Sequence, residues 1–220
     1  MKSHVCYFTN VYPAPSHTTM RREIHALEAL GAVVTRVAAR RFGGALVEPA
    51  DHEEAQRTAY TAHSLMRALG CLGLTGLRQP HRLARAVFDA VAVGSKSGRG
   101  IWKYLMYVGE ACVLLRVARG CSHIHANFGN ATAIAVMCRV LGGPPVSLRI
   151  HGPEEFDSFT PAEWDWKLRH AAFVAPISEY GSRRVREAVH GRHHNKVSTL
   201  RCGINMHTPE PGATLPSVLR

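Results

Sequence analysis

Hydrophobic and polar positions along this chain alternate between a strand-like and a helix-like pattern. Short apolar runs of strand length occupy residues 4–9, 33–38, 173–177 and 196–200, and two more end in His125 and His151. The segments between them repeat apolar residues at helical spacing, notably 101–119, 131–141, 161–170 and 179–189. About six to seven strands alternating with helices predict an α/β fold: one doubly wound, Rossmann-like parallel sheet flanked by helices.

The first helix is predicted between Ser16 and Gly31. Ser16 or Thr18 is expected to cap its start, and Gly31 is expected to end it. Its apolar face is expected to contain Met20, Ile24, Leu27 and Leu30. Ser178 is expected to cap the later helix over 179–189 in the same way.

The region between residues 42 and 100 has a less regular pattern. Residues 42–56 are expected to form a loop and a short turn. Two helices are predicted at about 60–69 and 81–93, because the glycines and proline of 70–80 should interrupt one longer helix. Residues 94–100 are rich in glycine and predict a flexible basic link.

The most informative stretch is 122–157, which has a strand–helix–strand pattern. The first strand leads into His125-Ala126-Asn127, and the second leads into His151-Gly152-Pro153-Glu154-Glu155. Parallel strands joined by a helix place their carboxyl ends at one edge of the sheet, where α/β proteins bind ligands. Both polar clusters are therefore expected at that edge.

Length and composition suit one folded domain. The chain has 220 residues, of which 46% are hydrophobic and 20% charged. We expect a domain over residues 1–205, followed by a Pro-rich tail over 206–220 that begins an interdomain linker.

The formal net charge of +11 favours an anionic partner. Basic residues concentrate in 67–119, which predicts either a solvated surface or a face on an anionic membrane with Trp102, Tyr104 and Tyr107 as interfacial anchors. Nucleic-acid binding is not expected, because no recognition helix, zinc finger or aromatic RNA-binding strand supports it.

Cysteine usage and the first residues bear on the compartment. None of the six cysteines forms a Cys-x-x-Cys pair, and several lie in apolar runs, so we expect reduced thiols. The chain enters a strand at once without a signal-peptide pattern, and its most apolar helix, 104–118, is too short to span a bilayer. The expected location is the cytoplasm, with peripheral attachment to the inner face of the plasma membrane as an option.

Several types of catalytic site can be weighed from the residues alone. The loop after the first strand lacks Gly-x-Gly-x-x-Gly, which argues against a nicotinamide or flavin cofactor. His123 and His125 share one strand face and leave a metal site open, but no nearby carboxylate has ligand spacing, so no metal is expected. His123 is expected to be structural and His125 to face the cleft. His151 either merely ends its strand or stands over the cleft.

The ordered motifs resemble the N-terminal, acceptor-side domain of a family 4 glycosyltransferase, in the subgroup that builds exopolysaccharides such as colanic acid and other cell-surface glycans. The first similar segment is Tyr12-Pro13-x-x-Ser16 with Glu23 and Ile24. The most specific segments are 123–129 and 150–157. Segments 175–180 and 197–205 complete a series that follows the family's order over nearly the whole chain.

This resemblance implies half of a GT-B fold and a retaining transfer of sugar from a nucleotide-sugar, such as a UDP- or GDP-sugar, to a lipid-linked or glycan acceptor. It assigns the catalytic position to His151, which would lie against the transferred sugar. Substrate contacts are expected from Ser16, His125, Asn127, Gly152, Glu154, Glu155 and Asp157. Interdomain positions are expected at Arg201, Gly203 and Asn205.

Two departures from the family limit what the resemblance implies. His17 stands where the subgroup tends to have glutamate. The donor-binding half, with its paired glutamates and basic residues for the diphosphate, has no counterpart in these 220 residues. We therefore expect no transfer by this chain alone. It would be either a remnant or half of an enzyme completed by a separate donor-domain chain, and the alternative is a non-catalytic module that binds acceptor or membrane.

Overall fold

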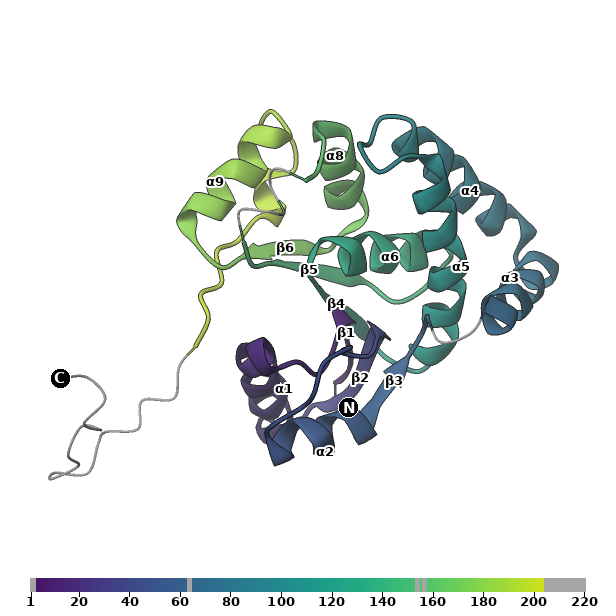
Figure 1. Ribbon diagram of the computed structural model, residues 1–220. Helices are drawn as coiled ribbons and strands as arrows, with labels where there is room; N and C mark the ends of the chain where they lie inside the picture. Colours follow the sequence, from purple (N-terminus) through teal and green to yellow (C-terminus); the bar gives the residue numbers. More distant parts are fainter. Residues whose placement is uncertain (1–2, 63–64, 153–154, 156–157, 204–220) are drawn as a thin grey trace, which may run out of the picture.

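The protein is built around one sheet of six parallel strands in the order β3-β2-β1-β4-β5-β6 (Figure 1). This computed structural model describes residues 3–62, 65–152, 155 and 158–203. The strands are β1 (His4–Val11), β2 (Val33–Arg40), β3 (Thr58–Tyr60), β4 (His123–Asn127), β5 (Val146–Ile150) and β6 (Phe173–Pro176). The predicted α/β class with a Rossmann-like parallel sheet is confirmed.

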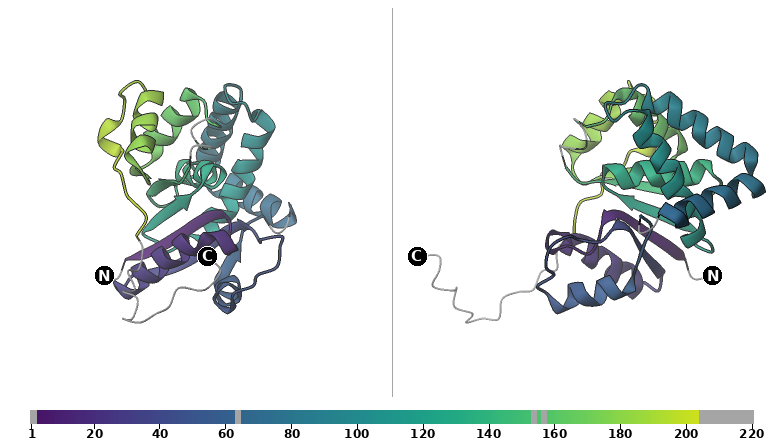
Figure 2. Two further views of the ribbon diagram at one scale, coloured as in Figure 1. Left: turned by 60° about the vertical axis from the view of Figure 1, so that its left-hand side comes forward. Right: turned by 45° about the vertical axis from the view of Figure 1, so that its right-hand side comes forward.

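Helices cover the two faces of the sheet in an unequal way (Figures 1 and 2). On one side lie α1 (Thr18–Ala29) and α2 (Pro49–Arg57). The other side carries α5 (Ile101–Val117), α6 (Gly129–Val140), α8 (Pro161–His170) and α9 (Glu179–Ala188). Helices α3 (Leu65–Arg78) and α4 (Pro80–Gly94) pack against α5 as a further layer. Short 3-10 helices occupy Pro15–His17 and His194–Lys196.

The two faces of the central strands differ in chemistry. Because side chains alternate along a strand, Phe8, Ala126 and Leu148 share one face, and all three are fully buried in the main apolar core with α5 and α6. The opposite face of the same strands, which is the α1 side, carries polar residues between β1 and β5. The fold thus places a polar row on one face of a sheet whose other face is apolar.

The helices predicted late in the chain are confirmed. Helix α8 has the predicted bounds 161–170, and the backbone N–H of Gly181 donates to Ser178 Oγ at 3.1 Å at the start of α9. The predicted cap of α1 is wrong, because His17 holds the cap position and makes no side-chain cap bond. Leu30 was expected in the buried face of α1, but it ends the helix and is 86% exposed.

The region 42–78 departs most from the sequence prediction. Residues 49–57, expected to be loop and turn, form α2, and Thr58–Tyr60 form the edge strand β3. The glycines expected to break the helix near residue 70 lie inside α3. Packing supports α3 at these glycines, since Ala68 and Leu72 lie against the core beside α5. Tertiary burial outweighs a local cost of about 1 kcal/mol for each glycine.

The expected last strand at 196–200 is present only in part. Val197 forms a single parallel bridge with Val174, and Leu200 N–H donates to the Pro176 carbonyl at 2.9 Å. This segment therefore runs along β6 and brings residues 200–203 back toward α1. The predicted tail over 206–220 lies outside the described residues.

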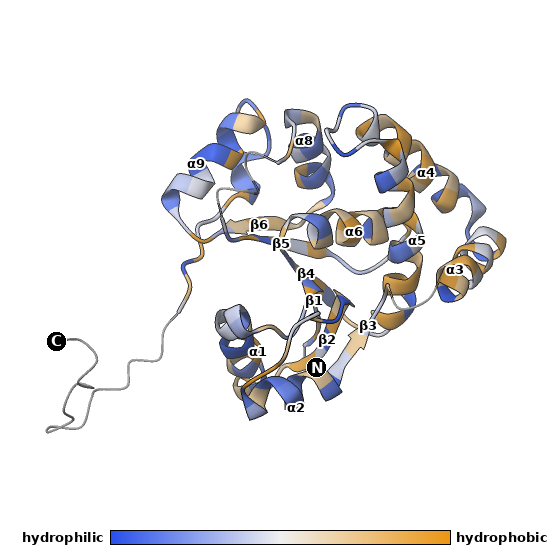
Figure 3. Cartoon of the chain, viewed as in Figure 1, coloured by the Kyte–Doolittle hydropathy of each residue, from blue (hydrophilic) through white to orange (hydrophobic). Residues whose placement is uncertain are grey.

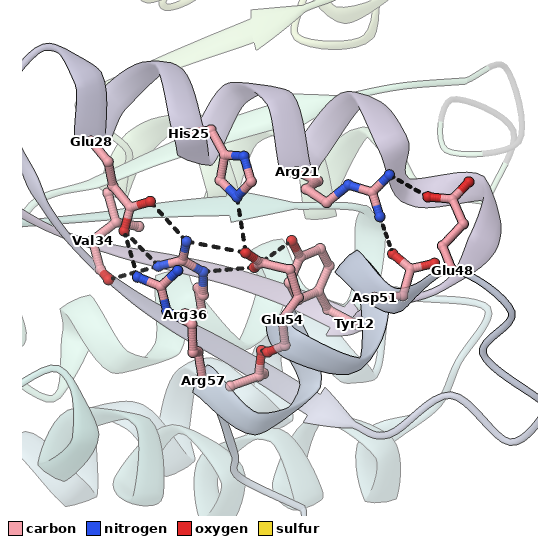
Figure 4. A network of polar contacts seen from close by, with 11 residues as sticks. Tyr12, Arg21, His25, Glu28, Val34, Arg36, Glu48, Asp51, Glu54 and Arg57 are labelled. Atoms are coloured by element: carbon pink, nitrogen blue, oxygen red, sulfur yellow. Dashed lines mark hydrogen bonds and ion pairs between the residues drawn. The ribbon is translucent and has the colours of Figure 1, made fainter.

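A buried polar network ties α1 and α2 to the sheet (Figure 4). Arg36 on β2 donates through Nε to Glu54 Oε2 at 2.6 Å and through Nη1 to Glu28 Oε1 at 2.7 Å. Tyr12 donates its hydroxyl to the same Glu54 oxygen at 2.8 Å. Arg36 and Glu54 are 3% and 2% exposed, so two charges are satisfied inside the protein. Through Tyr12, the network also fixes the chain just after β1.

Candidate functional site

The candidate site lies on the α1 side of the sheet, at the carboxyl ends of β1, β4 and β5. Tyr7, His125 and Ser147 are aligned across these three strands by their register. Thr9, Asn127 and Arg149 form the next aligned row, two residues further along. Polar side chains from three strands thus converge on the edge where the sequence predicted the two motif clusters.

His151 and Asn127, from the two clusters predicted at this edge, lie in direct contact. The His151 Nε2 lies 2.9 Å from Asn127 Oδ1. The His151 ring also stacks on Phe128, with ring centroids 4.5 Å apart. Burial, assisted by the positive charge of Arg149, lowers the pKa of His151 to about 4. His151 is therefore neutral near pH 7 and donates Nε2–H to the amide oxygen.

His123 and His125 share one serine hydroxyl. The His123 Nε2 lies 2.8 Å and the His125 Nδ1 2.7 Å from Ser147 Oγ. A hydroxyl has one proton to donate, so at least one of the two histidines must donate an N–H to it. Burial, followed by the charge of Arg149, lowers the pKa of His125 to about 3. His125 is 8% exposed, so its side chain is buried beneath the site and little of it is open to a ligand.

Glu23 of α1 contacts both rows from the helix that covers this face of the sheet. Its Oε2 accepts the Tyr7 hydroxyl at 2.8 Å, and its Oε1 lies 3.7 Å from both His125 Nε2 and Arg149 Nη1. Burial and the neighbouring Glu23 carboxylate raise the pKa of Tyr7 well above its usual value, so this phenol stays protonated. Tyr7 and Arg149 were not predicted as site residues. Their position on the same strand face as His125 and His151 is the signal that could have found them.

Glu155 supports the His151 turn from inside the protein. Its Oε1 accepts the backbone N–H of His151 at 2.9 Å, and the residue is 8% exposed. Burial raises the pKa of Glu155, and burial also lowers the pKa of the fully buried Lys167, whose charge favours the Glu155 carboxylate. The Lys167 Nζ lies 3.1 Å from the centroid of the Phe159 ring and 3.3 Å from the Gly129 carbonyl. The predicted substrate contact at Glu155 stays a prediction, since the contact observed here is to the backbone.

Of the remaining predicted residues, Gly152 lines a pocket with His151, and Arg201 and Gly203 line one with Glu23 and Arg149. Ser16 is exposed in the 3-10 helix before α1, and Gly152 lines a small pocket of about 60 Å³ with Ser178 and Tyr180. Arg201 and Gly203 line a pocket of about 250 Å³ that also involves α1. Glu154, Asp157 and Asn205 lie outside the described residues.

The predicted membrane anchors need correction. Tyr104 and Tyr107 are 0% and 2% exposed, and their hydroxyls donate to Glu163 and Asn130 inside the protein. They are core residues, because α5 is covered by α3, α4 and α6. Trp102 is 81% exposed and remains available as an anchor. In the described part of the chain, we find no helix long and apolar enough to cross a membrane.

The site offers hydrogen bonding and positive charge to a ligand. Neutral histidines and an amide can bind hydroxyl groups, and Arg149 can bind an anion. Within the described ranges, no group of three histidine, cysteine or acidic side chains could hold a metal ion. In comparisons with known proteins, no family model matches the sequence and no curated protein resembles it significantly.

Proposed function

We propose that this chain is the acceptor-side half of a retaining glycosyltransferase that adds sugar from a nucleotide-sugar to a lipid-linked or polysaccharide acceptor. The observation that carries the proposal is the bond between His151 and Asn127, which links the two most specific family-like segments across β4 and β5. Sequence order alone does not require these segments to meet in this way.

The chemistry of the site agrees with this role. A neutral imidazole held by Asn127 and stacked on Phe128 has a fixed ring orientation. Its Nδ1 has no partner among the described residues and can hydrogen-bond a sugar hydroxyl. Such a bond is stronger in a site that a second domain closes off from water. The nucleotide would be bound mainly by that second domain, in the same polypeptide or in another chain.

Loss of function in cells tests the role of His151. We expect His151→Ala to abolish incorporation of labelled sugar into cell-surface polysaccharide in native cells, while His194→Ala, at an exposed position in the last 3-10 helix, leaves it unchanged. Wild-type incorporation by a stably folded His151→Ala variant would exclude the proposed role of this residue.

Purification tests the half-enzyme part of the proposal. The chain isolated from its native cells in mild detergent should carry with it, covalently or as a partner, a domain with the family's paired glutamates. Sugar transfer by the isolated 220-residue chain would contradict this arrangement, because one half of a cleft cannot enclose the transition state.

A second candidate function, a module that docks on an anionic membrane, is favoured by the surface of α3, α4 and α5. Figure 3 shows long hydrophobic stretches on these helices, whereas α2 and α9 are mainly hydrophilic. The most exposed large apolar side chains there are Leu65, Met66, Leu77, Phe88, Trp102 and Met106. Residues 65–103 contain seven basic residues and one acidic residue, and an excess of positive charge along these helices favours anionic headgroups.

Vesicle binding tests this surface. We expect the protein to co-sediment with vesicles of phosphatidylcholine containing phosphatidylglycerol, and the Trp102→Ser/Met106→Ser variant to lose most of this binding. The matched control is Leu30→Ser, which removes an exposed apolar side chain on the far side of the sheet. Equal loss in the control, or binding that does not depend on Trp102, would exclude docking through these helices.

A further inference from the structure

A pocket of about 250 Å³ lies between α1 and the segment that follows β6. Its lining includes Thr19, Arg22 and Glu23 from α1, Arg149 from β5, and Leu200, Arg201 and Gly203. Three guanidinium groups and one carboxylate meet at this pocket, which gives it a net charge of about +2. The resemblance names Glu23, Arg201 and Gly203 but does not predict that they meet, because they come from segments far apart in the sequence.

Arg149 is the buried base of the pocket. Its side chain is 3% exposed, and its Nε and Nη1 have no hydrogen-bond partner among the described residues. Among the described residues, its Nη2 has one hydrogen-bond partner, the Cys202 sulfur at 3.6 Å. The nearest carboxylate oxygen in the described part of the chain, Glu23 Oε1, lies 3.7 Å from Nη1, beyond hydrogen-bond range. A guanidinium buried with free N–H groups is costly unless an anion binds to it.

Arg22 and Arg201 add charge at the wall of the pocket. The Nε of Arg22 is also buried without a partner in the described chain, although its Nη2 lies 3.4 Å from Thr19 Oγ1. Arg201 is exposed and brought to α1 because residues 197–200 run along β6. Glu23 carries a single negative charge, so it cannot neutralise all three cations, and one of its oxygens already accepts the Tyr7 hydroxyl.

We propose that this pocket binds a phosphate group, held by Arg149 at its base and by Arg22 and Arg201 at its wall. A phosphate dianion matches the net charge of the pocket, whereas a carboxylate would leave one charge unbalanced. Arginine forks bind phosphate oxygens in pairs. The volume exceeds that of a bare phosphate, so the phosphate belongs to a larger ligand. The proposal does not depend on the proposed function, because binding is measured without any sugar transfer.

Binding of inorganic phosphate tests the pocket in the full 220-residue chain. We expect saturable binding by isothermal titration calorimetry and a rise in the thermal unfolding midpoint, at constant ionic strength with chloride as the reference anion. Arg22→Gln and Arg201→Gln should each weaken binding by about tenfold or more, because each removes a charge-assisted hydrogen bond. Arg119→Gln, at an exposed position after α5, is the matched control and should bind as the wild type does.

Two further probes identify the source of the phosphate. A nucleoside diphosphate that binds more tightly than inorganic phosphate, with the same dependence on Arg22 and Arg201, assigns the pocket to a soluble nucleotide. Binding to vesicles that contain phosphatidic acid, if it depends on Arg22 and Arg201 and the nucleotide binds no more tightly than phosphate, assigns the pocket to a lipid headgroup. The proposal is overturned if no probe binds, or if Arg22→Gln and Arg201→Gln bind every probe as well as Arg119→Gln and the wild type do.

Discussion

Asn127 ends β4 and His151 directly follows the adjacent parallel strand β5, and their side chains meet through a hydrogen bond of 2.9 Å between Oδ1 and Nε2. Because the amide oxygen can only accept, this bond places the imidazole proton on Nε2 and leaves the lone pair on Nδ1. The contact between the two motifs in the folded protein therefore fixes the tautomer of His151. Any ligand of His151 would therefore meet an acceptor nitrogen.

The first prediction concerns this pair. Asn127→Asp replaces the amide by a carboxylate at the same position, and an adjacent negative charge favours the protonated ring. We expect the pKa of His151 to rise from about 4 by at least one unit. Histidine titration followed by NMR measures it. Asn195→Asp, exposed in the last 3-10 helix, serves as the control, and an unchanged His151 pKa in Asn127→Asp would contradict the bond.

The second prediction concerns the network under α1 and α2. Glu54→Gln leaves the buried Arg36 without one of its two carboxylate partners, and breaking a buried pair in this way costs about 3 to 5 kcal/mol. We expect a loss of this size in the free energy of unfolding in urea. Glu53→Gln, an exposed neighbour on the same helix, should change it by less than about 0.5 kcal/mol. Similar losses in both variants would show that the network contributes little.

The third prediction concerns the hydroxyl shared by two histidines. Ser147→Ala removes the partner of both His123 and His125 while leaving a fully buried side chain. Leaving buried nitrogens unpaired costs about 1 to 3 kcal/mol each, so we expect the free energy of unfolding to fall by about 2 to 6 kcal/mol. Ser198→Ala at an exposed position should be neutral. A neutral Ser147→Ala would mean that the two rings find other partners.

The strand–helix periodicity predicted five of the six strands, and it missed the short edge strand β3. Alternation of short, strand-length runs with helical segments gives β1, β2, β4, β5 and β6 within a few residues. Helix α2 was missed because its sequence, Pro-Ala-Asp-His-Glu-Glu-Ala-Gln-Arg, has almost no apolar face. Its burial depends on the polar contacts of Asp51 and Glu54 with α1 and β2, which periodicity does not reveal.

Only those parts of the candidate site that lie on one strand, or at the end of one, could be predicted from the sequence. His125, Asn127 and His151 follow from motif order, and their convergence follows from the rule for parallel strands. Alternation along β5 puts Arg149 on the same face as His151, but the contact of Glu23 with Tyr7, His125 and Arg149 depends on the rotation of α1 against the sheet and could not be predicted. Contacts between side chains of different elements are set by tertiary packing, and residue spacing in a single sequence does not predict them.

The last prediction concerns stability in mild acid. Burial lowers the pKa of His151 to about 4 and that of His125 to about 3, below the usual value of 6.5. Between pH 6.5 and these values the unfolded chain binds more protons than the folded one, so stability falls as pH falls. Each histidine contributes at most about 1.4 kcal/mol per pH unit.

Urea unfolding at pH 7, 6 and 5 measures this slope. The window lies above the range in which the carboxylates of Glu28 and Glu54 protonate, because ion pairing lowers the pKa of both. We expect His151→Gln to flatten the loss of stability between pH 6.5 and 5, even where it lowers stability at pH 7. His194→Gln should keep the wild-type slope, since that side chain is exposed in the last 3-10 helix. A His151→Gln slope equal to that of the wild type would mean that His151 titrates alike in the folded and unfolded chains, which is incompatible with its buried bond to Asn127.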